Sequence, residues 1–303
     1  MYKTKLILTA ICLSLGLGIF AQGPVSPSSL GLETVLINSG NTEKSSVGDL
    51  NSTYTAVSHH YLQGSSECYR RLKIFDKATG ILLASTKYSH DHRHSTKILF
   101  DPTNENVIYA VYTERSDASN DPDEDVRTYV RRIEYDGDSD FIMSPRKEVF
   151  YSNDYVFDFV IAPNGDVIIG AAQSDGSVRV NIYSPSLTLL SSNLISGAGA
   201  ASTGESVTYG VSMDMKGDDF IIGHNTGPWA TPNLRIKKYT YLGSGDISLP
   251  VNDFFREGHA LYNVHATFFE NDVKQNLALK PNGDILYLNV VDGAGWEIVK
   301  LTG

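Results

Sequence analysis

The sequence has little cysteine, an excess of acidic over basic residues, and no long apolar run beyond its first residues. Cys12 lies in an N-terminal leader, so Cys68 is the one thiol of the remaining chain and an internal disulfide is excluded. The 25 Lys and Arg stand against 35 Asp and Glu. This balance excludes nucleic acid as a general partner, because phosphate binding needs a basic surface. No later stretch is long and apolar enough to span a bilayer. We therefore expect a protein that a packed core stabilises.

The leader itself has the pattern of a secretory signal peptide. Lys3 and Lys5 precede an apolar run, and Ala21 stands before Gln22. Cys12 follows Ile11, where a lipoprotein signal needs a small residue, so we do not expect lipidation. The sequence thus predicts a signal peptide over residues 1–21 and one domain over residues 22–303, secreted or periplasmic and monomeric.

A repeated turn-and-strand unit organises the chain. Pro163-Asn164-Gly165-Asp166 opens an apolar strand, and Pro281-Asn282-Gly283-Asp284 does the same near the C-terminus. Asn-Gly turns between runs of Val and Ile are typical of hairpins. The second strands of successive units begin about 50 to 65 residues apart, a period typical of repeat folds, at Tyr54, Val107, Val167, Phe220 and Ile285.

These repeats predict an all-β fold, a five-bladed β-propeller of four-stranded blades. The fourth blade ends on a strand expected at residues 247–251. The fifth blade stops one strand short at the C-terminus. We expect Leu32–Asn38 to complete it by pairing with Trp296–Leu301, which would remove an exposed sheet edge.

The Asn-Gly-Asp-apolar repeat resembles the blades of many secreted propeller families, although the Asp-box of sialidases is not present. A narrower resemblance is carried by His90-Asp91-His92-Arg93-His94 followed by FDPTNENVIYAVY. It is similar to BNR-type propeller polysaccharide lyases, which have Asp-x-His-Asn before such a strand. His94 stands where that family has Asn, residues 112–115 lack the family's second His, and the known lyases have more blades. The resemblance implies eliminative cleavage of a polysaccharide.

Chemistry-bearing residues concentrate on one expected face. Connections from each outer strand to the next blade, and from each second strand to the third, share a face of a propeller. All eight histidines fall in or beside these connections: His59, His60, His90, His92, His94, His224, His259 and His265. Trp229 and Trp296 fall there too. Because histidine titrates near neutral pH and Trp rings stack on sugars, this distribution predicts a functional face.

The sharpest hypothesis concerns the connection YSHDHRHS. His92 and His94 are the candidate catalytic groups, and Asp91 could orient one imidazole. Alternating histidines could instead bind zinc or copper, or be solvated, and we assign no metal or cofactor. The candidate substrate-binding residues are His59, His60, Arg93, His224, Trp229, His259, His265 and Trp296.

Other features leave alternatives open. Arg71, Arg131, Arg179 and Arg235 align on the third strands, with Glu297 in the fifth blade; a repeat-wide column favours packing between blades over binding of acidic sugars. The loop Ser116–Asp125 could hold calcium but lacks EF-hand spacing.

The leading function is polysaccharide binding with lyase-type cleavage. The alternatives are a lectin or protein-interaction propeller, and a glycoside hydrolase using two of the acids Glu43, Asp154, Asp158, Glu205 and Asp272.

Overall fold

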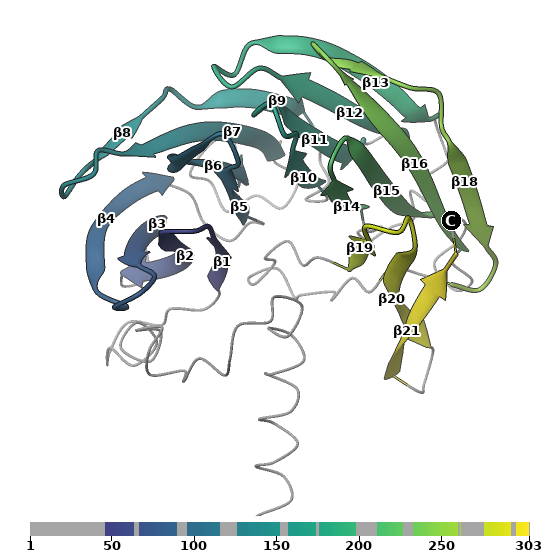
Figure 1. The fold of residues 1–303 in the computed structure, drawn as a ribbon, viewed down its shortest axis with the longest axis horizontal. Coiled ribbons are helices and arrows are strands. Elements are labelled where there is room, and N and C mark those ends of the chain that lie inside the picture. The colour runs from purple at the N-terminus through teal and green to yellow at the C-terminus, as the bar shows by residue number, and fades with distance from the viewer. Residues whose placement is uncertain are drawn as a thin grey trace, which may run out of the picture.

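The computed structural model describes residues 46–63, 67–89, 96–115, 126–151, 157–173, 176–197, 211–226, 233–259, 261, 276–291 and 295–302. In this part of the chain all regular structure is β-strand. The strands form five antiparallel sheets, which follow one another around a common centre as the blades of a propeller do (Figure 1). No helix that could cross a membrane occurs among the described residues. The all-β prediction and the sequence of sheets are confirmed.

Each sheet runs in chain order from its inner to its outer strand. The first consists of β1 (Ser46–Leu50), β2 (Tyr54–Gln63), β3 (Glu67–Asp76) and β4 (Leu82–Ser89). The second consists of β5 (Thr96–Asp101), β6 (Asn104–Arg115), β7 (Val126–Tyr135), β8 (Phe141–Met143) and β9 (Lys147–Tyr151). The third consists of β10 (Phe157–Ile161), β11 (Val167–Ala172), β12 (Val178–Tyr183) and β13 (Leu189–Ser196). The fourth consists of β14 (Val211–Lys216), β15 (Asp219–Thr226), β16 (Asn233–Gly243), β17 (Asp246–Ile247) and β18 (Asn252–Arg256). The fifth consists of β19 (Leu277–Leu279), β20 (Ile285–Val291) and β21 (Gly295–Leu301).

The repeated Asn-Gly-Asp turns join inner to second strands, as their sequence predicts. In the third sheet the Asn164 amide donates to the Asp166 carboxylate at 2.7 Å, and in the fifth the Asn282 amide donates to Asp284 at 2.8 Å. Gly165, between Asn164 and Asp166, has a φ of 87°. This left-handed conformation is accessible to glycine and strained for other residues. Two turns of one sequence therefore fold alike in two blades.

The outer position is divided in two of the sheets, which corrects one prediction. β8 and β9 both pair with β7, and β17 and β18 both pair with β16. Pro145 lies between the first two strands and Pro250 between the second two. Because proline has no N–H to donate, it interrupts pairing on an outer strand. The single strand predicted at residues 247–251 is therefore wrong after Ile247, and β18 takes the outer position.

Among the described residues, four apolar layers each lie between two consecutive sheets, and Val57 and Phe75 of the first sheet form a small fifth cluster. In the layer between the third and fourth sheets, Ile168 and Val180 pack against Met213 and Ile222. A Cβ on Gly170 would lie 2.7 Å from the Met213 sulfur, so that position has no space for a side chain. Packing at this distance holds neighbouring sheets in a fixed relation.

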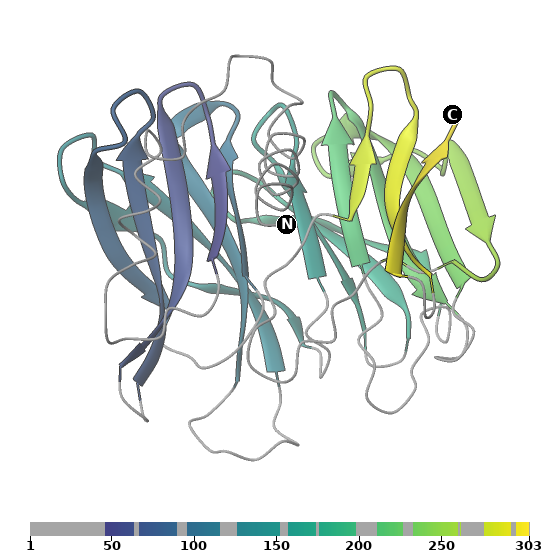
Figure 2. The same ribbon diagram turned by 90° about the horizontal axis from the view of Figure 1, so that it is seen from below.

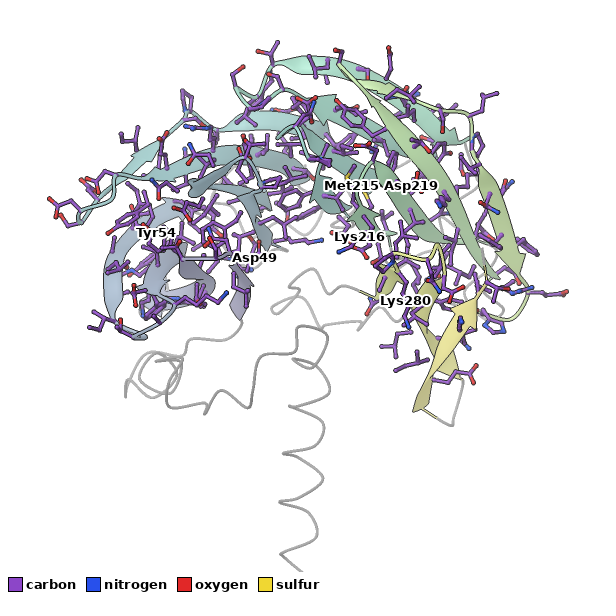
Figure 3. All side chains as sticks on the ribbon, in the orientation of Figure 1. Asp49, Tyr54, Met215, Lys216, Asp219 and Lys280 are labelled. Atoms are coloured by element: carbon purple, nitrogen blue, oxygen red, sulfur yellow. The ribbon has the colours of Figure 1, made fainter. Side chains whose placement is uncertain are left out.

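One buried and two half-buried carboxylates join consecutive inner strands. Asp49 on β1 accepts the Phe100 N–H, Asp158 on β10 accepts the Met213 N–H, and Asp214 on β14 accepts the Leu279 N–H, each at 2.7 Å. Burial raises the pKa of both Asp49 and Asp214, although these hydrogen bonds act in the opposite direction. Figure 3 shows Asp49 on the inner strand of the first sheet. Among the described strands, neighbouring sheets have no β-strand pairing with each other, and these side-chain hydrogen bonds join them near the centre of the molecule.

Asp158 also forms a buried ion pair with Lys97 of β5. The ammonium Nζ lies 2.5 Å from the Asp158 Oδ1, and the two side chains are 11% and 0% exposed. Lys97 donates in addition to the Phe159 carbonyl at 3.0 Å. A buried ion pair is stable only when further hydrogen bonds satisfy both charged groups. Here the Phe159 carbonyl accepts from Lys97 and the Met213 N–H donates to Asp158. Lys97 and Asp158 thus connect the second, third and fourth inner strands.

The predicted closure of the ring lies outside the described residues, since Leu32–Asn38 falls there. The first and last sheets stand at the two ends of the arc (Figure 1). Among the described strands β21 pairs with β20 alone, and Ile298 on it is 70% exposed. The number of blades and the N-terminal closing strand remain predictions.

Candidate functional site

The two ends of the sheets differ in their connections. Tight turns such as 77–81, 136–140, 163–166 and 281–284 gather at one end of the molecule, at the top of Figure 2. The strands β2, β6, β11, β15 and β20 all finish at the opposite end. We call that end, where residues 63, 115, 172, 226 and 291 lie, the histidine face. The predicted segregation of connections into two faces therefore holds for the described strands.

The connection that carries His90, Asp91, His92, Arg93 and His94 lies outside the described residues, but both of its ends are described. The Tyr88 hydroxyl lies 3.0 Å from the Thr96 hydroxyl, so a side-chain hydrogen bond joins the residues that flank the connection. Tyr88 also lies 2.6 Å from the Ser58 hydroxyl. All three side chains are buried. The histidine connection therefore starts and ends on a fixed polar base.

Tyr88, Tyr112 and Tyr129 form a row of packed rings beside the ends of the histidine connection. Tyr88 and Tyr112 pack edge to face with ring centroids 5.5 Å apart, and Tyr129 follows at 6.1 Å from Tyr112. The Arg146 guanidinium lies 4.6 Å from the centre of the Tyr129 ring and pairs with Glu114. Aromatic and cation contacts of this kind add to the packing of the first sheet against the second.

Two polar atoms in this cluster lack partners. Within the described part of the chain, the Tyr112 hydroxyl and the Arg131 Nε are buried without a hydrogen bond. Arg131 does donate through Nη1 to the Tyr88 carbonyl at 2.6 Å. Burial, and then the charge of Glu114, raises the pKa of Tyr112, so its hydroxyl keeps its proton and can donate it. An orphaned buried donor costs free energy, and here two lie at the base of the histidine connection.

The arginine column of the sequence is confirmed by the strand register. Each member of the column pairs with a residue of the second strand of its blade. The Cα pairs are Arg71 with His59, Arg131 with Ala110, Arg179 with Ala171, Arg235 with His224, and Glu297 with Asn289. Arg131 and Arg235 have structural contacts, the former with Tyr88 and the latter with Asp253. Arg179 is exposed. Arg131 thus joins the second blade to the first, and Arg235 forms a partly exposed ion pair within the fourth blade.

Two of the histidines in this register are buried. His59 is 2% exposed and His224 is 0% exposed. The His224 Nε2 lies 3.0 Å from the Ser196 hydroxyl of the third sheet. Burial, with a smaller effect of neighbouring cations, lowers the pKa of each ring to about 4. Both rings are therefore neutral at pH 7, and their direct contact with a ligand stays a prediction.

These two histidines make stability depend on pH. Their pKa values in the folded protein lie below the ordinary 6.5, so below about pH 6.5 the unfolded chain binds protons that the folded chain does not. Stability is thus complete above pH 6.5 and falls as the pH falls toward 4, by roughly 3 kcal/mol per histidine. Urea unfolding at pH 7 and pH 4.5 measures the loss. His224→Gln should reduce it by about half, and an unchanged loss in that variant would contradict this assignment.

His259 lies at the side of the fifth sheet. Its Nδ1 is 2.8 Å from the Tyr287 hydroxyl, and its ring packs edge to face on the Tyr287 ring. The main chain two residues on is fixed as well, because the Asn225 side chain accepts the Leu261 N–H at 2.7 Å. His259 is half-buried, so it is the one predicted ligand-binding histidine that the described structure places at the surface.

The remaining predicted site residues are not tested by the described residues. Seven of them lie outside the described residues: His90, Asp91, His92, Arg93, His94, Trp229 and His265. The same holds for the loop Ser116–Asp125 and for four of the candidate acids, Glu43, Asp154, Glu205 and Asp272. His60 and Trp296 lie on β2 and β21. Asp158, the fifth acid proposed for a hydrolase, is wholly buried against Lys97. The sequence interpretation missed Tyr88, Tyr112 and Glu114. Tyr112 and Glu114 alternate along β6 and so point to the same side of the strand, and Tyr88 directly precedes the histidine connection; these positions could have indicated them.

No protein-family model and no curated protein sequence matches the chain. Solved structures align with the chain at low identity. A polysaccharide lyase aligns with a TM-score of 0.48 at 12% identity, over 84% of this chain and 68% of the lyase. An exo-β-1,3-galactanase from Clostridium thermocellum aligns with a TM-score of 0.43 at 10% identity, over 84% of this chain and 58% of the galactanase. The β-propeller domain of the Trilobed protease from Pyrococcus furiosus aligns with a TM-score of 0.43 at 7% identity, over 87% of this chain and 82% of that domain.

Proposed function

We propose that the protein is exported and binds a glycan through the histidine face. One observation supports this most: the described strands that flank residues 90–95, 227–232 and 262–275 end at one end of the sheets, and the tight turns lie at the other. Imidazole, indole and guanidinium groups together offer hydrogen bonds and flat surfaces for stacking, which sugars need. The proposal assigns ligand contacts to His60, His259, His265, Trp229 and Trp296, with His59 and His224 beneath them.

A second candidate function, eliminative cleavage of the bound glycan, is favoured by the base of the histidine connection. Elimination requires a base that takes the proton next to a sugar carboxylate. The electron pair of that bond then forms a carbon–carbon double bond, the glycosidic carbon–oxygen bond breaks, and an acid protonates the leaving oxygen. We assign the base to His92 or His94, oriented by Asp91. The buried Tyr112 hydroxyl, which keeps its proton, lies close to the ends of that connection and suits a donor role.

The test uses His92→Ala and His94→Ala, with Lys216→Ala near the turns as the matched control. Binding is measured on a panel of acidic and neutral polysaccharides, and cleavage by absorbance of new unsaturated ends. We expect both histidine variants to lose binding or cleavage with little change in thermal stability, because surface connections contribute little to the core. The control should behave as wild type. Wild-type behaviour of both histidine variants on a polysaccharide that the protein binds would move the site to His259, Trp229 and Trp296.

A further inference from the structure

The outer strand of the third blade, β13, differs from the other long outer strands of the described chain. Its eight residues, LLSSNLIS, include no charged residue and no proline. The outer strands of three other blades are charged, by Lys87 on β4, Lys147 on β9 and Asp253 on β18. Charged residues, prolines and short outer strands keep the edges of sheets from pairing with other chains. β13 has none of these protections.

The free edge of β13 lies on the circumference of the molecule (Figure 1). Among the described strands β13 pairs with β12 alone. In an antiparallel sheet, the N–H and C=O groups of every second residue of an outer strand point away from the sheet. The edge therefore presents a row of backbone donors and acceptors to a further strand.

Exposed apolar side chains border this edge. The turn between β16 and β17 packs against β13, because the Ser191 hydroxyl donates to the Gly245 carbonyl at 2.5 Å. On β13 and around this turn, six large apolar side chains are at least 39% exposed: Leu189, Leu190, Leu194, Leu242, Leu249 and Val251. We call them the apolar rim patch. They expose on the order of 600 Å², which is the upper end of what the surface of a monomeric protein presents.

The strand is complementary to itself under a twofold axis. Its register with β12 shifts once between Leu189 and Ser191, so that Leu189, Ser192 and Leu194 point to one side of the sheet. Ser191 and Asn193 point to the other side. A twofold axis through Ser192, perpendicular to the sheet, places Leu189 opposite Leu194 of a second copy. It also places Ser191 opposite Asn193 and Ser192 opposite its own equivalent. Apolar side chains thus face apolar ones, and polar side chains face polar ones.

We propose that two copies of the chain form a dimer by antiparallel pairing of β13 with β13 around this axis. The self-complementary sequence favours a second copy over a foreign strand, because a twofold interface brings the same surface together from both subunits. Full burial of the apolar rim patch in both copies would remove about 1,200 Å² from water, the area at which stable interfaces begin. Backbone hydrogen bonds between the two edges add to it. The proposal departs from the monomer that the sequence predicts.

The direction of β13 determines how the histidine faces lie in such a dimer. β13 begins after residues 184–188 at the end with the tight turns, and it ends with Ser196, whose hydroxyl lies 3.0 Å from the His224 Nε2. Antiparallel pairing therefore directs the two histidine faces to opposite ends of the dimer. If each face binds a glycan as proposed above, one dimer can join two polysaccharide chains, which a monomer cannot do.

Sedimentation velocity of the chain without its predicted signal peptide tests the dimer, at protein concentrations from about 1 to 100 μM. Ser192→Lys places two ammonium groups opposite each other across the axis, so we expect the dissociation constant to rise at least about tenfold. Ser85→Lys is the matched control, because Ser85 is an exposed serine of the equally long outer strand β4. It should stay within about twofold of wild type. Thermal unfolding confirms that each variant is folded.

A cross-link tests the position of the axis. In a chain with Cys68→Ala, Ser192→Cys brings two thiols together at the axis, and an added oxidant such as copper phenanthroline should take two electrons from them and form a disulfide between the copies. Ser85→Cys should stay uncoupled. The covalent dimer is measured by gel electrophoresis without reductant.

The outcomes separate this inference from the proposed function. A wild-type protein that sediments as a monomer throughout would overturn the dimer. A dimer that Ser192→Lys does not weaken and Ser192→Cys does not cross-link would overturn the pairing of β13. A monomer with slow amide exchange in residues 189–194 would assign the edge to another segment of the same chain and overturn the proposal as well.

Beads coated with a polysaccharide that the protein binds test the opposed faces. Wild type should agglutinate them, whereas Ser192→Lys should bind without agglutinating. A protein that sediments as a dimer weakened by Ser192→Lys but binds no polysaccharide would support this inference and overturn the proposed function.

Discussion

Lys97→Met should destabilise the protein by roughly 3 to 5 kcal/mol, because it leaves the Asp158 carboxylate buried without its cation. The lost contacts are the 2.5 Å ion pair and the 3.0 Å hydrogen bond to the Phe159 carbonyl. Both belong to inner strands, where the second, third and fourth sheets meet. Urea unfolding at neutral pH measures the change as a fall in the midpoint at constant slope.

Two controls make that result specific. Combining Lys97→Met with Asp158→Asn removes both charges and keeps an acceptor for the Met213 N–H, so it should recover much of the lost stability. Arg127→Met breaks an ion pair with Glu148 whose side chains are 35% and 40% exposed, and it should cost less than about 1 kcal/mol. A Lys97→Met variant as stable as wild type would show that the central pair does not hold the sheets together.

Deleting residues 22–38 should make the protein aggregate. The expected partner of Leu32–Asn38 is β21, whose outer edge has no paired strand among the described residues. Ile298 on that strand is 70% exposed, and an apolar open edge recruits other chains. Light scattering and gel filtration of the truncated protein measure the effect.

A point substitution tests the same closure with less disturbance. Val35→Pro removes an N–H in the middle of the expected strand, whereas Ser28→Pro lies before it and serves as the control. The first should aggregate like the truncation and the second should not. A truncated protein that does not aggregate, with unchanged thermal unfolding, would show that residues 22–38 do not close the ring.

Much of the architecture could be predicted because it depends on local rules. Asn-Gly-Asp turns and runs of Val and Ile determine where strands begin, and the alignment of the repeats placed Arg71 and Arg235 at corresponding positions correctly. The divided outer strands were also readable, since Pro145 and Pro250 interrupt them, but apolar Leu249 and Val251 concealed the break. Here a single proline outweighed apolar composition.

The contacts between blades could not be predicted in the same way. Asp158 and Met213, or Tyr88 and Arg131, are tens of residues apart, and no local pattern states which carboxylate meets which N–H. The roles of His59 and His224 depended on burial, which moves their pKa values away from the range that made them candidate ligands. Sequence shows which side chains share a face, and only packing shows which of them reach the surface.

Amide hydrogen exchange with and without bound polysaccharide tests the central claim most directly, because it locates the ligand on one end of the sheets. We predict slower exchange in residues 59–63, 67–71, 86–89 and 109–115, which lie at or next to the histidine face. Exchange should be unchanged in the turns 77–81, 136–140 and 184–188 at the opposite end. Protection confined to those turns, with none at the ends of β2, β4 and β6, would contradict glycan binding through the histidine face.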